Sequence, residues 1–151
     1  MPVSSYVGQH VINTLVPFNA KTTAEATGLA VAVDGYSEVL MVWNQGVSLD
    51  TLSGSTYWTV TFQECAVTTA GSFTLIGAAN IEGGGATVLI DAPEEDPTLL
   101  VRRYKGKLAY VRMIATQTGT HTNGTPVSAF VVLSGAVHIP VTVETELGTP
   151  S

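Results

Sequence analysis

The sequence predicts an all-β fold: an antiparallel β-sandwich or small β-barrel of about seven to eight strands with an extended N-terminal arm. The strongest observation is the strict alternation in residues 56–64, where Trp58, Val60 and Phe62 fall on one face and polar or tyrosine side chains on the other. This is the pattern of a strand with one face in a core. Short apolar runs also recur between turn-forming residues along the chain, as in sandwiches and barrels.

The chain has 151 residues, which suits one domain. We expect an N-terminal arm over residues 1–27, a β domain over 28–140 and an extended C-terminal tail over 141–151. We expect one strand within this arm, near residues 9–15. Two interpretations stay open for it: an arm that lies on a neighbouring subunit, or an ordered edge strand of the same domain.

The first part of the β domain contains two apolar runs. Residues 29–33 form a short one that ends at Asp34-Gly35, a strong turn pair. Residues 38–44 are apolar at both odd and even positions, which predicts a strand covered on both faces. The Gly- and Ser-rich residues 45–55 then form a loop before the amphipathic strand.

Shorter segments follow. Residues 73–76 fit a strand or one helical turn, and residues 87–90 a short strand. Strands are expected over residues 97–104 and 108–115, joined by Lys105-Gly106 in a tight hairpin with Gly106 at its tip. A last strand covers residues 127–133.

Charged residues are scarce. They make up 12% of the chain, about half the usual share, so Thr, Ser, Gly and Asn must cover much of the surface. Hydroxyl groups cost less to desolvate than ions, which favours oligomers and larger assemblies. The net charge of −6 argues against nucleic acid and against anionic membranes as partners.

Cys65 is the single cysteine, so an internal disulfide is excluded. The first residues lack the basic and apolar regions of a signal peptide, and no apolar stretch is long enough to span a membrane. We therefore expect function in a cytoplasm or in a particle assembled there.

No set of residues has the spacing of a catalytic or metal site, so we expect no enzyme activity, no cofactor and no metal. His10, His121 and His138 lie far apart in the sequence; His121 is expected to be solvated in a Thr- and Gly-rich loop, and His138 to be structural. Cys65 is expected to be a buried or interface thiol. The acidic residues between 91 and 96 fit three interpretations: an exposed connection, a calcium site, or a contact with a neighbour's basic hairpin.

Two segments resemble a known family. Residues 91–104 (Asp-Ala-Pro-Glu-Glu-Asp-Pro-Thr-Leu-Leu-Val-Arg-Arg-Tyr), followed by Tyr110-Val111-Arg112, and residues 117–126 (Gln-Thr-Gly-Thr-His-Thr-Asn-Gly-Thr-Pro) are similar to head decoration (cement) proteins of tailed bacteriophages. The similarity is to those of long-tailed phages and gene-transfer particles, and covers roughly residues 37–140.

The resemblance implies a structural virion protein that is made in the bacterial host cytoplasm and sits on the capsid exterior. It implies the major capsid protein as partner, a homotrimer, and stabilisation of the capsid by clamping neighbouring subunits. Two alternatives stay open: a tail or head–tail completion protein, and a carbohydrate- or host-receptor-binding β module in which Trp43 and Trp58 offer stacking platforms.

We expect the interface at two places, the N-terminal arm and the basic hairpin. The candidate contact residues are Val3, Tyr6, Val7, Arg102, Arg103 and Lys105.

Overall fold

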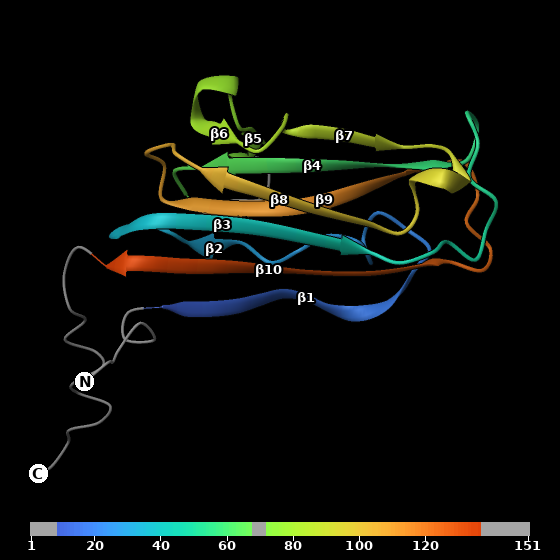
Figure 1. Ribbon diagram of the computed structural model, residues 1–151, viewed down its shortest axis with the longest axis horizontal. Helices are drawn as coiled ribbons and strands as arrows, with labels where there is room; N and C mark the ends of the chain where they lie inside the picture. Colours follow the sequence, from blue (N-terminus) through green and yellow to red (C-terminus); the bar gives the residue numbers. More distant parts are fainter. Residues whose placement is uncertain (1–8, 68–71, 137–151) are drawn as a thin grey trace, which may run out of the picture.

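Two antiparallel sheets make up the part of the chain that the structure, a computed structural model, describes: residues 9–67 and 72–136 (Figure 1). The first sheet has the strand order β1-β10-β3-β8-β6, and the second β2-β9-β4-β5, with β7 also paired to β4. The strands are β1 (His10–Ala20), β2 (Val31–Ala32), β3 (Tyr36–Gln45), β4 (Tyr57–Cys65), β5 (Thr74–Leu75), β6 (Ile81–Glu82), β7 (Thr87–Ile90), β8 (Thr98–Tyr104), β9 (Tyr110–Thr118) and β10 (Thr125–Ala136), with short 3-10 turns at Ala78–Asn80 and Pro93–Glu95. The predicted sandwich is confirmed, and it is not closed into a barrel.

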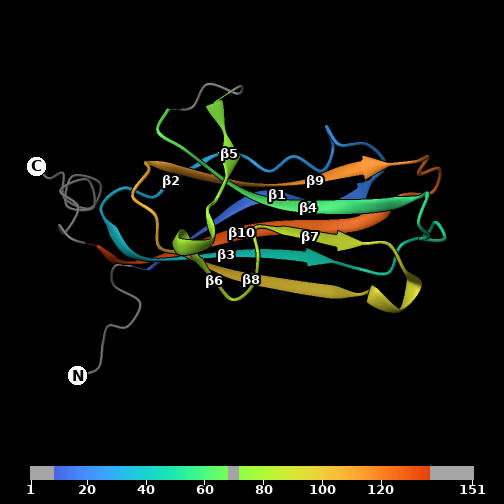
Figure 2. The ribbon, with the colours of Figure 1, turned by 90° about the horizontal axis from the view of Figure 1, so that it is seen from above.

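The long strands of both sheets run along the long axis of the molecule (Figures 1 and 2). This arrangement is that of an aligned sandwich, in which the inner faces of two sheets interdigitate. The core is built around aromatic and aliphatic side chains that are almost fully buried: Trp43, Trp58, Phe62, Met41, Met113, Ile90 and Leu133. No helix in the described part is long and apolar enough to cross a membrane.

The strand β4 confirms the alternation seen in the sequence. Trp58, Val60 and Phe62 are each 0% exposed, and the residues between them are half-buried. β3 is the central strand of the first sheet, and its consecutive residues Met41, Val42 and Trp43 are all buried. Leu40 is only half-buried and Asn44 is exposed on the outer side, so the expected cover on both faces holds only in the middle of the strand.

Part of the segment expected as an arm belongs to the domain. β1 covers His10–Ala20, longer than the expected strand, and pairs antiparallel with β10 of the same chain. Ala20 and Ala26 are both 0% exposed in the core. Of the two interpretations, the edge strand of the same domain is therefore correct for this stretch.

The expected hairpin at Gly106 is wrong. β8 pairs with β3 and β6 in the first sheet, whereas β9 pairs with β2 and β4 in the second, so residues 105–109 cross from one sheet to the other. A side chain at Gly106 would collide with the ring of Tyr104, which turns into the core. A short connection between two strands does not by itself decide between pairing and crossing, and this link takes the less common course.

Candidate protein-binding surface

The outer face of the first sheet presents a continuous set of apolar side chains. In β10, Leu133 and Val131 point into the core, so Val132 and Phe130 point outward by the alternation of a strand. The pairing register places Val132 between Val11 and Leu40, and Phe130 beside Val42, which is next to Val101. We call this set the apolar face: Val11, Leu40, Val42, Leu99, Val101, Phe130 and Val132.

Several members of the apolar face are strongly exposed. Val11 is 65% exposed, Leu99 62% and Val101 40%. Val42 is only 7% exposed because it lies between Phe130 and Val101 in the middle of the sheet. Contiguous exposed apolar surface on a protein marks sites that contact other molecules.

A cluster of ion pairs borders the apolar face at one end. Arg103 holds Glu38 through both of its carboxylate oxygens, at 2.8 Å from Nη2 and 3.1 Å from Nε. Glu82 accepts from Arg103 Nη1 at 3.1 Å and from Lys105 Nζ at 2.8 Å. The hydrogen bond to Glu38 raises the pKa of Arg103, and the hydrogen bond from Lys105 lowers the pKa of Glu82. The predicted contact residues Arg103 and Lys105 are therefore on the surface, but carboxylates of the same chain already neutralise them.

Arg102 does not lie on the surface, so its prediction as a contact residue is wrong. It is 8% exposed, and its guanidinium donates to the carbonyl oxygens of Gly83 at 2.9 Å and Gly85 at 3.0 Å. Its Cζ lies 5.3 Å from the centre of the Phe62 ring, and burial lowers its pKa. Neighbouring residues of a strand point to opposite faces, so Arg103 points outward while Arg102 points inward.

The outer face of the second sheet is polar but almost uncharged. The register aligns Leu89, Thr59 and Thr116 across β7, β4 and β9, and Thr61 lies between Thr87 and Ile114. Hydroxyl groups dominate this face, in contrast to the apolar side chains on the first sheet. Of the two outer faces, the apolar face gains more free energy from burial against a partner.

His121 is buried, which corrects the expectation that it is solvated. It is 4% exposed and its ring lies 4.5 Å from the ring of Trp58. Nε2 lies 3.1 Å from the carbonyl oxygen of Thr118 and 3.3 Å from that of Tyr57, and Nδ1 lies 3.9 Å from a carboxylate oxygen of Asp50. The small polar residues of its loop fold over the end of the sandwich and place the imidazole inside.

Two carboxylates of the acidic stretch are used within the domain. Glu95 accepts from the backbone N–H groups of Asp91 at 2.7 Å and Ala92 at 3.1 Å. Asp96 accepts from the backbone N–H of Ser48 at 3.0 Å. Across the described residues, no group of three or more acidic, histidine or cysteine side chains is arranged to hold a metal ion. These two carboxylates therefore help to hold the connection between β7 and β8, and a contact of this stretch with a neighbour stays a prediction.

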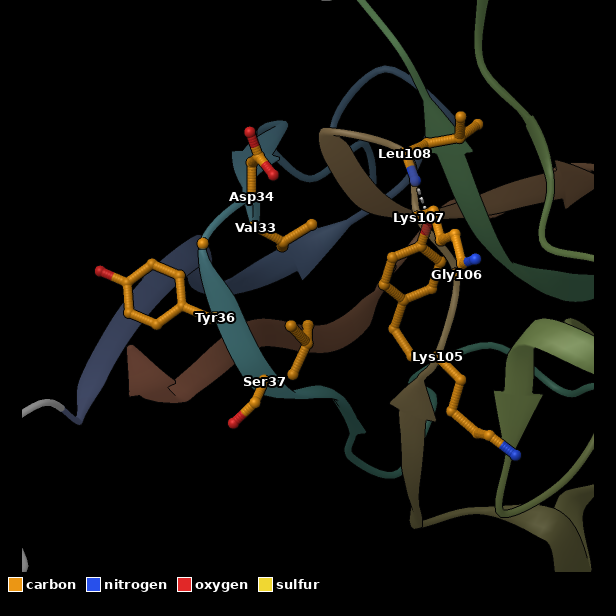
Figure 3. Close-up of a pocket in the computed structure, with 11 residues that line it drawn as sticks. Val33, Asp34, Tyr36, Ser37, Lys105, Gly106, Lys107 and Leu108 are labelled. Carbon is orange, nitrogen blue, oxygen red and sulfur yellow. Dashed lines mark hydrogen bonds between the residues drawn. The ribbon is translucent and has the colours of Figure 1, made fainter. Parts of the chain in front are cut away.

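A hollow of about 150 Å³ lies at the end of the sandwich where residues 33–39 meet residues 104–108 (Figure 3). At its inner side the Tyr104 hydroxyl donates to Glu64 at 2.5 Å and accepts from the backbone N–H of Leu108 at 3.0 Å. Burial and the bond to Glu64 raise the pKa of Tyr104. The hollow is smaller than the roughly 300–1,000 Å³ of ligand pockets, and both buried polar groups are satisfied by each other.

The remaining predicted residues are placed as follows. Trp43 and Trp58 are 0% exposed, so neither can stack on a sugar. Cys65 is buried, in line with the expected inert thiol. Val3, Tyr6, Val7 and His138 lie outside the described residues, as do residues 141–151.

The apolar face does not follow from the sequence alone. Its signal lies in the apolar residues at both odd and even positions of 38–44 and in the run Leu99-Leu100-Val101. In 38–44 this pattern predicts burial on both sides, because an outward apolar residue of an uncovered strand cannot be told from a buried one by sequence. Comparison with models of protein families gave no match, and neither did comparison with curated proteins.

Proposed function

We propose that this protein is a structural virion component that binds the outside of an icosahedral bacteriophage capsid. It stabilises the shell by clamping neighbouring major capsid subunits. The resemblance to head decoration proteins suggests this role, in which the chain acts as a homotrimer without catalytic activity or cofactor.

The observation that carries the proposal is the apolar face. Leu99 and Val11 are each more than 60% exposed, in a chain with about half the usual charge. Burying such side chains against a partner contributes roughly 25 cal/mol per Å² of apolar surface. We assign the contact with the shell to this face, and the neutralised ion-pair cluster beside it adds orientation more than affinity.

The physical mechanism is mass action. A protein that binds the assembled shell and not its separated subunits lowers the free energy of the shell by its binding free energy. Copies distributed over one lattice each hold adjacent subunits together, so weak contacts add up over the whole shell.

The test uses purified phage heads that lack this protein. The wild-type chain is expected to cosediment with the heads and to raise the temperature at which they release DNA. Leu99→Lys is expected to weaken binding by about tenfold or more, because a charge replaces a buried apolar contact. Leu89→Lys is the matched control: Leu89 is 46% exposed on the other sheet and its replacement is expected to leave binding unchanged.

Circular dichroism of each variant shows that the fold is intact before binding is compared. A wild-type chain that does not bind heads contradicts the proposal, and equal losses from both variants contradict the assignment to the apolar face. Labelling that places the protein at the tail or portal vertex in electron micrographs would instead support a tail or head–tail completion protein.

A further inference from the structure

The strand β1 leaves one side of the first sheet open. Within the described residues β1 pairs with β10 alone. The contact recorded on its other side is the hydrogen bond from the Leu29 N–H to the Thr14 carbonyl oxygen, at 2.9 Å. Among the residues that the structure describes, the stretch His10–Asn13 is therefore an edge without a partner strand on that side.

This edge lacks the features that usually block pairing with another chain. Proteins protect open edges with charges, proline, β-bulges or very short strands. Pro17 and the two register shifts of β1, between Asn13 and Leu15 and between Leu15 and Phe18, lie beyond the stretch His10–Asn13. β1 has 11 residues and contains no Lys, Arg, Asp or Glu. Val11 is 65% exposed and Ile12 38%, so a strand added here would also bury apolar side chains.

The sequence that follows β10 has the pattern of a strand. Val137, Ile139, Val141 and Val143 alternate with His138, Pro140, Thr142 and Glu144. β-branched residues at every second position are the signature of a strand with one apolar face. At about 3.3 Å per residue, seven such residues reach farther than the four-residue open edge of β1.

Pro140 is compatible with this pattern. The N–H groups of a strand point alternately to its two sides, so Pro140 shares its side with His138 and Thr142. If those positions face away from β1, the missing N–H of proline costs nothing, as in other edge strands. Ile139 and Val141 then donate their N–H groups toward β1.

We propose that residues 137–143 of one copy add as a strand to the open edge of β1 in a second copy. The chains associate by exchanging their C-terminal segments, and the apolar side chains of the segment lie on the same face of the sheet as Ile12. This is strand addition, in which backbone hydrogen bonds supply affinity and alternate side chains supply specificity.

The geometry of the sheet favours a second copy over the same chain. β10 lies between β1 and β3, so the free side of β1 faces away from the strand that residues 137–143 follow. To reach that side of its own β1, the segment would have to reverse and cross the residues that enter β1.

Full-length variants that each carry one added cysteine test which chain donates the strand. Ile12→Cys and Val141→Cys are prepared separately, mixed, and treated with a short bismaleimide crosslinker; the native Cys65 is buried, and the wild-type chain measures its background. The expected product is a crosslinked dimer in the mixture and not in the wild type. A double variant that crosslinks within one chain at all concentrations would overturn the proposal.

Light scattering on the full chain is the second measurement, and it does not depend on crosslinker reach. The mass of the wild type is expected to be a multiple of the chain mass. Val141→Asp and Ile12→Lys are each expected to raise the protein concentration at which half of the assemblies dissociate by about tenfold or more. The matched controls are Thr142→Asp, on the other parity, and Leu89→Lys, on the other sheet; both are expected to behave as wild type. A monomeric wild type, or equal effects of Val141→Asp and Thr142→Asp, contradicts the exchange.

The inference does not depend on the proposed function. Both measurements use the isolated protein without phage heads, so their failure leaves shell binding by the apolar face untouched. Failure of shell binding likewise leaves the exchange of segments untouched.

Discussion

Two pairs of buried polar side chains join the two sheets of this domain. Glu64 is 8% exposed and accepts the hydroxyl proton of Tyr104, and the fully buried Thr125 hydroxyl accepts from the indole N–H of Trp58 at 3.0 Å. Buried polar groups cost about 1–3 kcal/mol each when they lose a partner. These residues therefore specify how the two sheets meet, more than they offer chemistry to a substrate.

Tyr104→Phe tests one of these pairs. Burial and the bond to Glu64 raise the pKa of Tyr104 above its ordinary value of 10.0. Since the folded state holds the phenol proton more tightly than the unfolded chain, this contribution is complete below pH 10 and lost as the pH rises above it. We expect Tyr104→Phe to lower the free energy of unfolding by about 1–3 kcal/mol at neutral pH.

The same variant is expected to lose less stability than the wild type between neutral pH and about pH 11, because the group that titrates is gone. Urea unfolding at several pH values measures both effects. Equal losses in the wild type and the variant over this range would show that Tyr104 does not couple to stability.

At the scale of elements, one arginine joins a loop to a strand. Arg102 in β8 donates to the carbonyl oxygens of Gly83 and Gly85, in the loop between β6 and β7. Gly83 has φ +96, and a Cβ there would lie 2.7 Å from the carbonyl oxygen of Val101. The glycine thus lets the loop approach β8 closely enough for the arginine to hold it.

Arg102→Met and Arg103→Met form a matched pair of neighbours on this strand. We expect Arg102→Met to lower the free energy of unfolding by about 1–3 kcal/mol, because it removes the hydrogen bonds from a charged donor to the carbonyl oxygens of Gly83 and Gly85. Arg103→Met removes ion pairs whose side chains are 41–48% exposed, and is expected to cost at most about 1 kcal/mol.

Chemical denaturation followed by tryptophan fluorescence measures the two variants. A larger loss from Arg103→Met than from Arg102→Met would contradict the structural role assigned to Arg102. It would also restore Arg102 as a candidate for contact with a partner.

At the scale of the whole molecule, the two ends of the described chain meet in one sheet. His10 pairs with Leu133, so the fold is completed only when β1 and β10 come together. Both sheets share one core, with Trp43 in the first and Trp58 in the second. The outer faces differ: one is apolar beside an open edge, and the other is covered with threonine.

The shared core predicts cooperative unfolding. We expect tryptophan fluorescence and far-ultraviolet circular dichroism to report the same denaturation midpoint, because neither sheet can stay folded when the core between them is lost. Two separate midpoints would show that the sheets unfold independently.

Alternation along the chain is enough to assign strands such as β4, where Trp58, Val60 and Phe62 all point into the core. The period of side-chain direction is a local property of extended backbone, so it can be read without knowing the neighbours. The sandwich class follows from the same local patterns.

Other features depend on which strands become neighbours. The crossing at Gly106, the burial of Arg102 and His121, and the apolar face all follow from the strand order and the course of the loops. A strand pattern states which side chains share a face; tertiary packing decides whether that face is covered by the same chain. The scarcity of charged residues and the strand pattern are therefore determined by the sequence alone. The surface that we propose for binding is decided by the tertiary structure, because it exists only once the strands have become neighbours.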